Sequence, residues 1–387
     1  MLWAREARER TLALVAPLDD EQLFGPRLPT VNPLLWELGH VAWFQEHWVL
    51  CVAAGLAPAR ADCDALYDSS AVPHDVRWDL PLPSRAATLA FLASTLERVL
   101  ARPRPWDERT RYFLRLAVFH EDLHDEAFAI TLQTHGYPAP ALLADARAAS
   151  RPDASPRAGD VTHPGGAFLL GATADAPFVF DNEKWAHEVR LRPFAIARSP
   201  VTQAEFAAFV HDGGYDARSL WTDDGWRWRE ATSTRHPVYW HRDGDAWLRR
   251  EFDQLVPLEP QRPMVHANAH EADAYCRWAK RRLPSEAEWE AAAVADTAAT
   301  RDLGQADRDF SKSGWEWTAS AFLPYPGFVV DPYEDYSRPW FHTHRVLRGS
   351  SWLTPARLVR PTFRNFYTPD RCDPFAGFRT CALDEAA

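Results

Sequence analysis

The feature that most constrains the fold is an uninterrupted segment at residues 109–134. It contains neither proline nor glycine, and the first residue of either type after it is Gly136. Its apolar residues recur at spacings typical of a largely buried helix: Leu114, Leu116, Val118, Leu123, Phe128 and Ile130. The sequence therefore predicts one long helix here, around which the first half of the chain is built.

Two histidines lie four residues apart in this segment. Residues at this spacing share one face of a helix, so His120 and His124 can direct two imidazoles at one point, as metal ligands do. With fifteen histidines in the chain, chance placement on a solvated face is the alternative. Acidic neighbours favour the metal, because a carboxylate can fix the tautomer of a ligating imidazole. The candidates for this supporting role are Glu121, Asp122, Asp125 and above all Glu126.

Composition limits the classes of protein to which the chain can belong. A length of 387 residues suits two domains, and 46% hydrophobic with 25% charged residues is typical of a globular protein. The sequence has no run of eighteen apolar residues and no signal-peptide core, which predicts a soluble cytoplasmic protein without a membrane partner. A net charge of −11 argues against nucleic acid as a partner.

Cysteine and tryptophan usage add two expectations. The five cysteines are odd in number and lack CxxC spacing, so we expect free thiols in a reducing compartment. Eighteen tryptophans lie mostly in the second half, where aromatic rings usually fill an irregular core. A few such rings can instead form a cage for a quaternary ammonium group.

The first half predicts a bundle of helices. Helices are expected at residues 1–24, 33–44, 85–101 and 109–134, with residues 51–83 irregular. His40 lies in the apolar second helix; such a histidine is more often part of a core, but two histidines on one helix leave a metal under-coordinated and a third ligand is required. Four-helix bundles build metal sites from facing helices.

The texture of the sequence changes after a stretch rich in Ala, Pro, Asp and Arg at residues 138–164, which we interpret as a linker. Beyond it, short strand-like runs and turns predominate, with helices expected near 203–210 and 269–280. The predicted fold class is two-domain, α followed by α+β. The domains are expected at residues 1–150 and 160–387.

Several motifs give the chain a resemblance to known families. The second half resembles the formylglycine-generating-enzyme type of domain, which has a C-type-lectin-like fold, through GGAFLLG (165–171), PVTQAEF (200–206), RLPSEAEWE (282–290), WEWTAS (315–320), LRGSSW (347–352) and GFRT (377–380). The first half resembles the DinB-like four-helix bundle through LLWELGHVAWF (34–44) and HEDLHDE (120–126).

The two domains fused in this order resemble the ergothioneine-type sulfoxide synthases, which are non-haem iron enzymes. The resemblance implies that His40, His120 and His124 bind Fe(II), although a three-histidine site holds zinc equally well. It also implies a reaction that uses O2 to join sulfur to C2 of the imidazole of hercynine, the trimethylammonium betaine of histidine. Asn365 and Phe366 hold the positions that contact hercynine in the family; the alternative is that they only pack the core.

Departures from the family pattern concern the second substrate, the chalcogen donor. Tyr367 stands where enzymes that take γ-glutamylcysteine typically have Asp, and the loop at residues 76–83 is not rich in arginine. Trp78, Asp79 and Tyr367 offer instead the stacking surface and acceptors that suit a neutral sugar, and Arg371 ends the same C-terminal segment. We assign these four residues to the donor site.

Two further departures concern the oxidation itself. The family's oxygen-side tyrosine falls on Phe322, with Tyr325 three residues on, and Leu123 replaces an expected Gln. A site without a phenol proton donor at that position would run the oxidation differently. These changes match the branch that makes selenoneine from hercynine and a selenosugar. We therefore expect an oxidoreductase that forms a carbon–selenium bond, with catalytic candidates Tyr325 and Phe322.

Two alternatives stay open at this point. One is an ergothioneine-type synthase with a different thiol donor, and the other is a non-catalytic binding module, because both folds also occur without known chemistry. Formylglycine-generating activity is not expected, because its paired active-site cysteines have no counterpart near residues 315–379.

Overall fold

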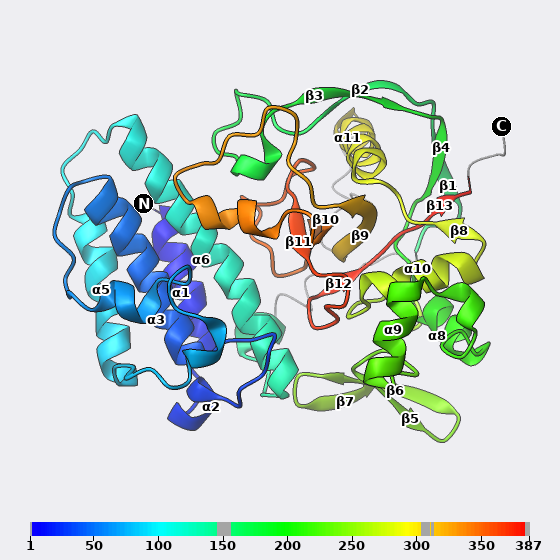
Figure 1. Cartoon of the computed structure of the whole chain (residues 1–387), viewed down its shortest axis with the longest axis horizontal. Coiled ribbons are helices and arrows are strands. Elements are labelled where there is room, and N and C mark those ends of the chain that lie inside the picture. Colours follow the sequence, from blue (N-terminus) through cyan, green and yellow to red (C-terminus); the bar gives the residue numbers. More distant parts are fainter. Residues whose placement is uncertain (1, 145–155, 303–309, 311–312, 384–387) are drawn as a thin grey trace. The chain divides into compact units, whose positions relative to one another are not determined.

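The computed structural model describes residues 2–144, 156–302, 310 and 313–383. The chain divides into two compact units, Met1–Ala149 and Ser150–Ala387, which run from blue to cyan and from green to red in Figure 1. The sequence places a linker at residues 138–164, and its central part, 145–155, lies outside the described residues. The exact domain limits therefore stay a prediction.

The N-terminal unit is helical, and its long helices lie side by side as a bundle (Figure 1). Its elements are α1 (Leu2–Val15), α2 (Asp20–Phe24), α3 (Leu34–Gln45), the π-helix η1 (Glu46–Val52), α4 (Cys63–Tyr67), the 3-10 turn η2 (His74–Val76), α5 (Arg85–Leu100) and α6 (Glu108–His135). Helix α3 packs against both α5 and α6, and α1 packs against α6. The predicted fold class of this unit is confirmed.

Two local predictions in this unit are wrong. Helix α1 ends at Val15 because Pro17 follows, and a separate helix α2 starts after Asp19, whose side chain accepts a hydrogen bond from the Gln22 N–H at 2.7 Å. Residues 51–83 are also less irregular than expected, since they contain the end of η1 and all of α4.

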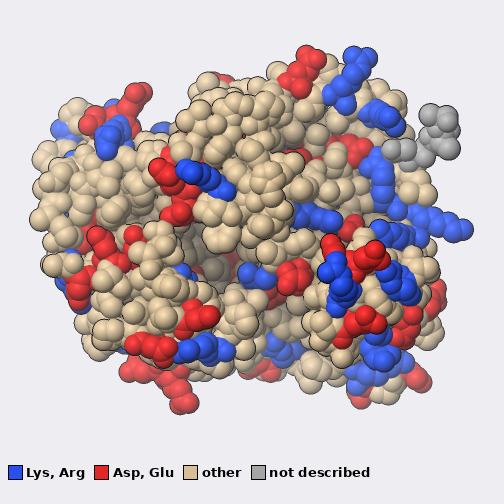
Figure 2. Space-filling view, viewed as in Figure 1, with Lys and Arg blue, Asp and Glu red and all other residues tan. Residues whose placement is uncertain are grey.

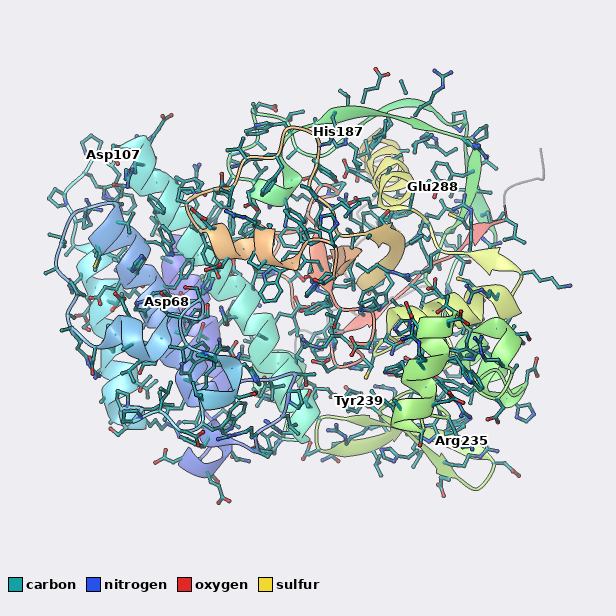
Figure 3. All side chains as sticks on the ribbon, in the orientation of Figure 1. Asp68, Asp107, His187, Arg235, Tyr239 and Glu288 are labelled. Atoms are coloured by element: carbon teal, nitrogen blue, oxygen red, sulfur yellow. The ribbon has the colours of Figure 1, made fainter. Side chains whose placement is uncertain are left out.

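Helix α6 confirms the long helix predicted from the uninterrupted segment. Asp107, labelled in Figure 3, caps its start by accepting a hydrogen bond from the Thr110 N–H at 2.7 Å. Gly136 ends it in the left-handed conformation with φ +69°. Both signals are local, which explains why the sequence predicts the limits of this helix well.

The C-terminal unit is an α+β domain with short strands. The strands of its described residues form four sheets, in the orders β1-β4-β13-β8, β11-β10-β9-β12, β2-β3 and β5-β6-β7. The strands are β1 (Asp160–His163), β2 (Gly166–Leu170), β3 (His187–Leu191), β4 (Phe194–Ala197), β5 (Trp240–Asp243), β6 (Ala246–Glu251), β7 (Gln254–Pro257), β8 (Arg281–Arg282), β9 (Gly314–Ala321), β10 (Arg345–Ser350), β11 (Asn365–Tyr367), β12 (Ala376–Gly377) and β13 (Cys381–Ala382). The helices are α8 (Gln203–His211), α9 (Asp223–Thr232), α10 (Ala269–Trp278) and α11 (Glu286–Asp302), with 3-10 turns η3 (Asp181–Glu183), η4 (Arg218–Leu220), η5 (Glu334–Tyr336) and η6 (Arg338–Trp340).

The second of these sheets determines the position of the predicted substrate residues. Strand β11 pairs antiparallel with β10, in a register that sets Phe366 opposite Val346 and Asn365 opposite Leu347. The next strand, β9, carries Trp315 and Trp317, both fully buried. Tryptophan therefore fills the core beneath this sheet, as expected from the composition.

Oppositely charged side chains form pairs on the surface of the C-terminal unit. On the face shown in Figure 2, basic and acidic side chains lie intermixed, and around α9 the guanidinium groups of Arg229 and Arg235 both bind Asp216, at 2.6 and 2.9 Å. Such exposed pairs contribute little to stability. Among the described helices, none is both long and apolar enough to cross a membrane.

One close approach fixes α3 against Tyr67, the last residue of α4. A Cβ at Gly39 would lie 2.2 Å from Cε1 of Tyr67, a distance that real contacts do not allow. Glycine at this position therefore lets the Tyr67 ring lie directly on the backbone of α3. His40, the next residue, depends on the same contact because its ring is hydrogen-bonded to the Tyr67 carbonyl oxygen.

We predict that Gly39→Ala lowers the free energy of unfolding by about 1–3 kcal/mol, the usual cost of overpacking a buried site. Urea denaturation of wild type and variant measures the change. The same substitution in a Tyr67→Leu background should cost less, because the smaller side chain leaves room for the methyl group. An equal cost in both backgrounds would mean that Tyr67 is not the steric partner.

Candidate metal centre

Three imidazoles meet inside the helical unit, two from α6 and one from α3. The Nε2 atom of His120 lies 3.2 Å from Nε2 of His40 and 3.2 Å from Nε2 of His124. The potential ligand atoms of the three residues all lie within 4.8 Å of one another. His40 and His120 are buried and His124 is partly buried. The structure thus brings together the three residues that the sequence predicts as ligands.

The second ring nitrogen of two of these histidines is held by a hydrogen bond. His40 Nδ1 lies 2.8 Å from the carbonyl oxygen of Tyr67, and His124 Nδ1 lies 2.5 Å from Oε1 of Glu37. Both partners are acceptors, so each Nδ1 donates and each Nε2 keeps its lone pair. This is the tautomer in which both Nε2 atoms can bind a metal.

Aromatic rings from α3 stack on two of the imidazoles and orient them. Phe44, also on α3, lies parallel to His120 with ring centroids 3.5 Å apart, and Trp36 stacks on His40 at 5.0 Å. Burial is the main cause that lowers the pKa of His40 and of His120 well below the ordinary value, and their imidazole neighbours lower it further. Both rings are therefore neutral, which is the form that binds metals.

This arrangement fits a transition-metal ion. Two nitrogens 3.2 Å apart can both lie about 2.1 Å from one ion, the usual metal–imidazole distance. Imidazole ligands suit iron, zinc, copper and nickel, so the donor set accepts Fe(II) without selecting it. Three protein ligands leave further coordination positions for substrates.

The acidic residues beside the α6 histidines serve a different purpose from the one predicted. Glu121 binds Arg8 at 2.7 Å, and Asp125 accepts a hydrogen bond from Thr11 at 2.8 Å, so both carboxylates face α1. The prediction that they support the ligands is wrong, because helical geometry turns these positions away from the histidine face. Asp122 and Glu126 are buried, and the supporting role of Glu126 stays a prediction.

The carboxylate that does contact a ligand is Glu37, which the sequence analysis missed. A signal for it exists, since Glu37 precedes His40 by three residues and so lies on the same side of α3. Its partner, however, is His124 on another helix. That pairing depends on how α3 and α6 pack.

In the C-terminal unit, the structure brings Phe322 and the predicted hercynine residues together. The rings of Phe322 and Phe366 stack with centroids 4.1 Å apart and planes 13° from parallel. Asn365 accepts a hydrogen bond from the Phe366 N–H at 2.8 Å through its side-chain oxygen. Phe366 is partly buried, so one ring face is backed by Phe322 while part of the side chain stays accessible.

Tyr325, the candidate proton donor, lies in a buried network of charges. Its hydroxyl is 3.2 Å from Glu286 and 2.9 Å from Arg348, and the Arg364 guanidinium stacks over its ring. Burial raises the pKa of the Tyr325 phenol. These contacts give Tyr325 a structural role in the buried network. Its part in the oxidation stays a prediction.

The predicted donor residues have partners within their own units. Trp78 donates its indole N–H to the Gly25 carbonyl at 3.2 Å, and Asp79 forms an exposed ion pair with Arg27 at 2.6 Å. In the C-terminal unit, the Arg371 guanidinium lies 5.2 Å from the centre of the Tyr367 ring. It also binds Asp373 at 2.6 Å. Contact of these residues with a donor stays a prediction.

Both units match families of known proteins. Residues 4–128 match the DinB superfamily, and residues 146–314 and 308–383 match the sulfatase-modifying factor enzyme 1-like domain. The hercynine oxygenase of Mycolicibacterium thermoresistibile is 35% identical, over 97% of this chain and 92% of that protein. The hercynine oxygenase of Mycolicibacterium smegmatis is 33% identical over 96% of both chains.

The chain belongs to the hercynine oxygenase family.

Similarity to formylglycine-generating enzymes is confined to part of the chain. The enzyme of Streptomyces coelicolor is 30% identical over 64% of this chain. Hercynine oxygenases, in contrast, match both units in the same order. The fold class predicted from the sequence, a DinB-like bundle followed by a C-type-lectin-like domain, is confirmed.

We predict that His40→Ala, His120→Ala and His124→Ala each reduce bound iron and abolish turnover, because two ligands hold an ion far more weakly than three. Iron per protein is measured after anaerobic reconstitution with Fe(II). His47→Ala is the matched control, because His47 packs against Trp43 in the same unit but contributes no atom to the cluster. A variant with unchanged iron content would remove that residue from the ligand set.

Proposed function

We propose that this protein is a non-haem iron enzyme that uses O2 to form a carbon–selenium bond at the imidazole C2 of hercynine, with a selenosugar as donor. Membership of the hercynine oxygenase family supports hercynine as the acceptor. The three converging imidazoles support the metal. The donor is inferred from the surroundings of one arginine, Arg77.

His40, His120 and His124 would hold the iron through their Nε2 atoms, which face one another. When bound, the ion supplies the activation of O2 and a binding position for the chalcogen of the donor. Burial keeps the His40 and His120 rings neutral by lowering their pKa, and Tyr67, Phe44 and Glu37 orient the three rings.

Hercynine carries a trimethylammonium group, a carboxylate and an imidazole. The ring face of Phe366 attracts the ammonium, which cannot form hydrogen bonds, and Phe322 fixes that ring by stacking on it. Asn365 supplies an amide N–H for the carboxylate while its oxygen holds the Phe366 backbone. This pair of residues is assigned to hercynine, and the distinction from histidine rests on Phe366.

The donor assignment rests on the contacts of the Arg77 guanidinium. It is the single arginine in residues 76–83, the loop that by the family resemblance would bind the carboxylates of an anionic donor. Its guanidinium stacks on Trp36, 4.0 Å from the ring centre, and donates to Asn32 at 2.7 Å and to the Val72 carbonyl at 3.1 Å. A guanidinium engaged in this way does not present its paired N–H groups to the carboxylate of an anionic donor. A neutral selenosugar needs no cationic partner.

The main alternative is a thiol donor, as in the ergothioneine-type enzymes. The relatives' name, hercynine oxygenase, leaves the donor open, and this alternative uses the same metal ligands and the same hercynine residues. The two functions differ only in the donor. An experiment that compares donors therefore separates them.

We predict that Phe366→Ala weakens hercynine binding by about 1–2 kcal/mol, the range for a desolvated cation over an aromatic face. Calorimetry with hercynine and with histidine measures the effect, and histidine binding should change less because it lacks the three methyl groups. Phe328→Ala is the matched control, since Phe328 packs on Phe341 in the same aromatic cluster. Equal losses for both ligands would mean that Phe366 only supports the fold.

We predict that the wild-type enzyme accepts a selenosugar and refuses γ-glutamylcysteine, whose two carboxylates and ammonium would lack charged partners. Tyr367→Asp should lower kcat/KM for the selenosugar by inserting an unpaired charge, and Tyr367→Phe, which keeps the ring, should lower it less. Mass spectrometry of products from each donor, with hercynine and Fe(II) present, gives the comparison. Turnover of γ-glutamylcysteine alone would overturn the selenium assignment and leave the thiol alternative.

A further inference from the structure

Glu37 is buried with a single hydrogen-bonding partner. It lies on α3, is 1% exposed, and its Oε1 is 2.5 Å from Nδ1 of His124. Its second oxygen, Oε2, is buried and has no hydrogen-bond partner among the described residues. Among the described residues, the Glu37 carboxylate therefore forms its hydrogen bond with the His124 imidazole alone.

Other buried carboxylates of the same unit are held differently. Glu46 is bound by Arg98 and by the Ala59 N–H, and Glu121 is bound by Arg8 and Thr11. Each has a guanidinium partner that offsets the cost of burying its charge. Glu37 has none among the described residues, so packing and ion pairing do not explain it. A buried carboxylate without a cationic partner destabilises the fold, which favours a functional reason for its presence.

We propose that Glu37 is a positioning residue of the metal centre, which holds the Nδ1–H of His124 and so directs its Nε2 at the metal. The proposal rests on the three-histidine centre of the proposed function. It distinguishes the ligands, because His40 donates to a neutral carbonyl oxygen whereas His124 donates to a carboxylate. A carboxylate partner makes the imidazole a stronger electron donor.

The position of Glu37 on α3 also links two of the candidate ligands to one helix. Helix α3 carries both His40, a ligand, and Glu37, the partner of a ligand on α6. One helix thus sets the orientation of two of the three rings. A shift of α3 relative to α6 would disturb both ligands at once, so the metal site reports on the packing of this helix pair.

The test compares Glu37→Gln with wild type in metal binding, without substrates. Gln keeps the size and one acceptor oxygen but removes the charge. Titration with Co²⁺, followed by its visible absorption, and with Fe²⁺ under anaerobic conditions should give about tenfold weaker binding and a shifted Co²⁺ spectrum. The melting temperature of the metal-free variant should stay equal or rise, because a poorly compensated buried charge is gone.

Glu121→Gln is the matched control. Glu121 is as deeply buried as Glu37 and lies next to His120 in sequence, but it binds Arg8. Its substitution should lower the melting temperature of the metal-free protein and leave the Co²⁺ spectrum unchanged. The two variants are thus expected to respond in opposite ways in the two measurements.

The outcomes separate this proposal from the function on which it rests. A wild type that binds neither Co²⁺ nor Fe²⁺ would overturn the metal centre itself. Wild-type binding with an identical affinity and spectrum in Glu37→Gln would overturn the role of Glu37 and leave the metal centre standing. A loss of melting temperature in Glu37→Gln, with metal affinity unchanged, would assign Glu37 to the fold.

Discussion

The packing of α3 against α6 is the constraint on which the candidate metal centre depends. Helix α6 alone brings two imidazoles to one point, because residues four apart share a helical face. The third imidazole, the carboxylate beside His124 and the ring stacked on His120 all come from α3. Two helices thus supply the ligands and most of the groups that orient them. Burial adds the last condition, because it keeps His40 and His120 neutral.

The C-terminal unit holds its candidate substrate residues by a comparable use of buried charge. Strand β11 is only three residues long, and the residue before it, Arg364, binds both oxygens of Glu286 at 2.9 and 3.1 Å. Arg348 binds the same carboxylate at 2.8 Å. The Arg364 guanidinium also lies 4.9 Å from the centre of the Phe322 ring, on which Phe366 stacks. A short strand at a sheet edge therefore gains a fixed position from a network in the core beneath it.

Sequence reasoning succeeded where the structure follows from local geometry. The limits of α6 follow from a capping Asp107 and a terminal Gly136, and the spacing of its histidines follows from the helical period. It failed where the partner of a residue is set by tertiary packing. Glu37 gives no local sign that it faces His124, and the acidic residues of α6 were assigned to the ligands although Glu121 faces Arg8. The comparisons confirm the family, and the donor stays a proposal.

Arg77 links the donor question to the metal centre. Its guanidinium stacks on Trp36, and Trp36 stacks on His40 with planes 11° from parallel. The same arginine contributes to the lowered pKa of His40. Turning Arg77 toward an anionic donor would remove the support behind Trp36 and loosen the ring of a metal ligand. Under the proposed function, a change of donor preference toward a carboxylate-bearing thiol would therefore need a new cation in this loop, since the existing one is part of the structure that holds His40.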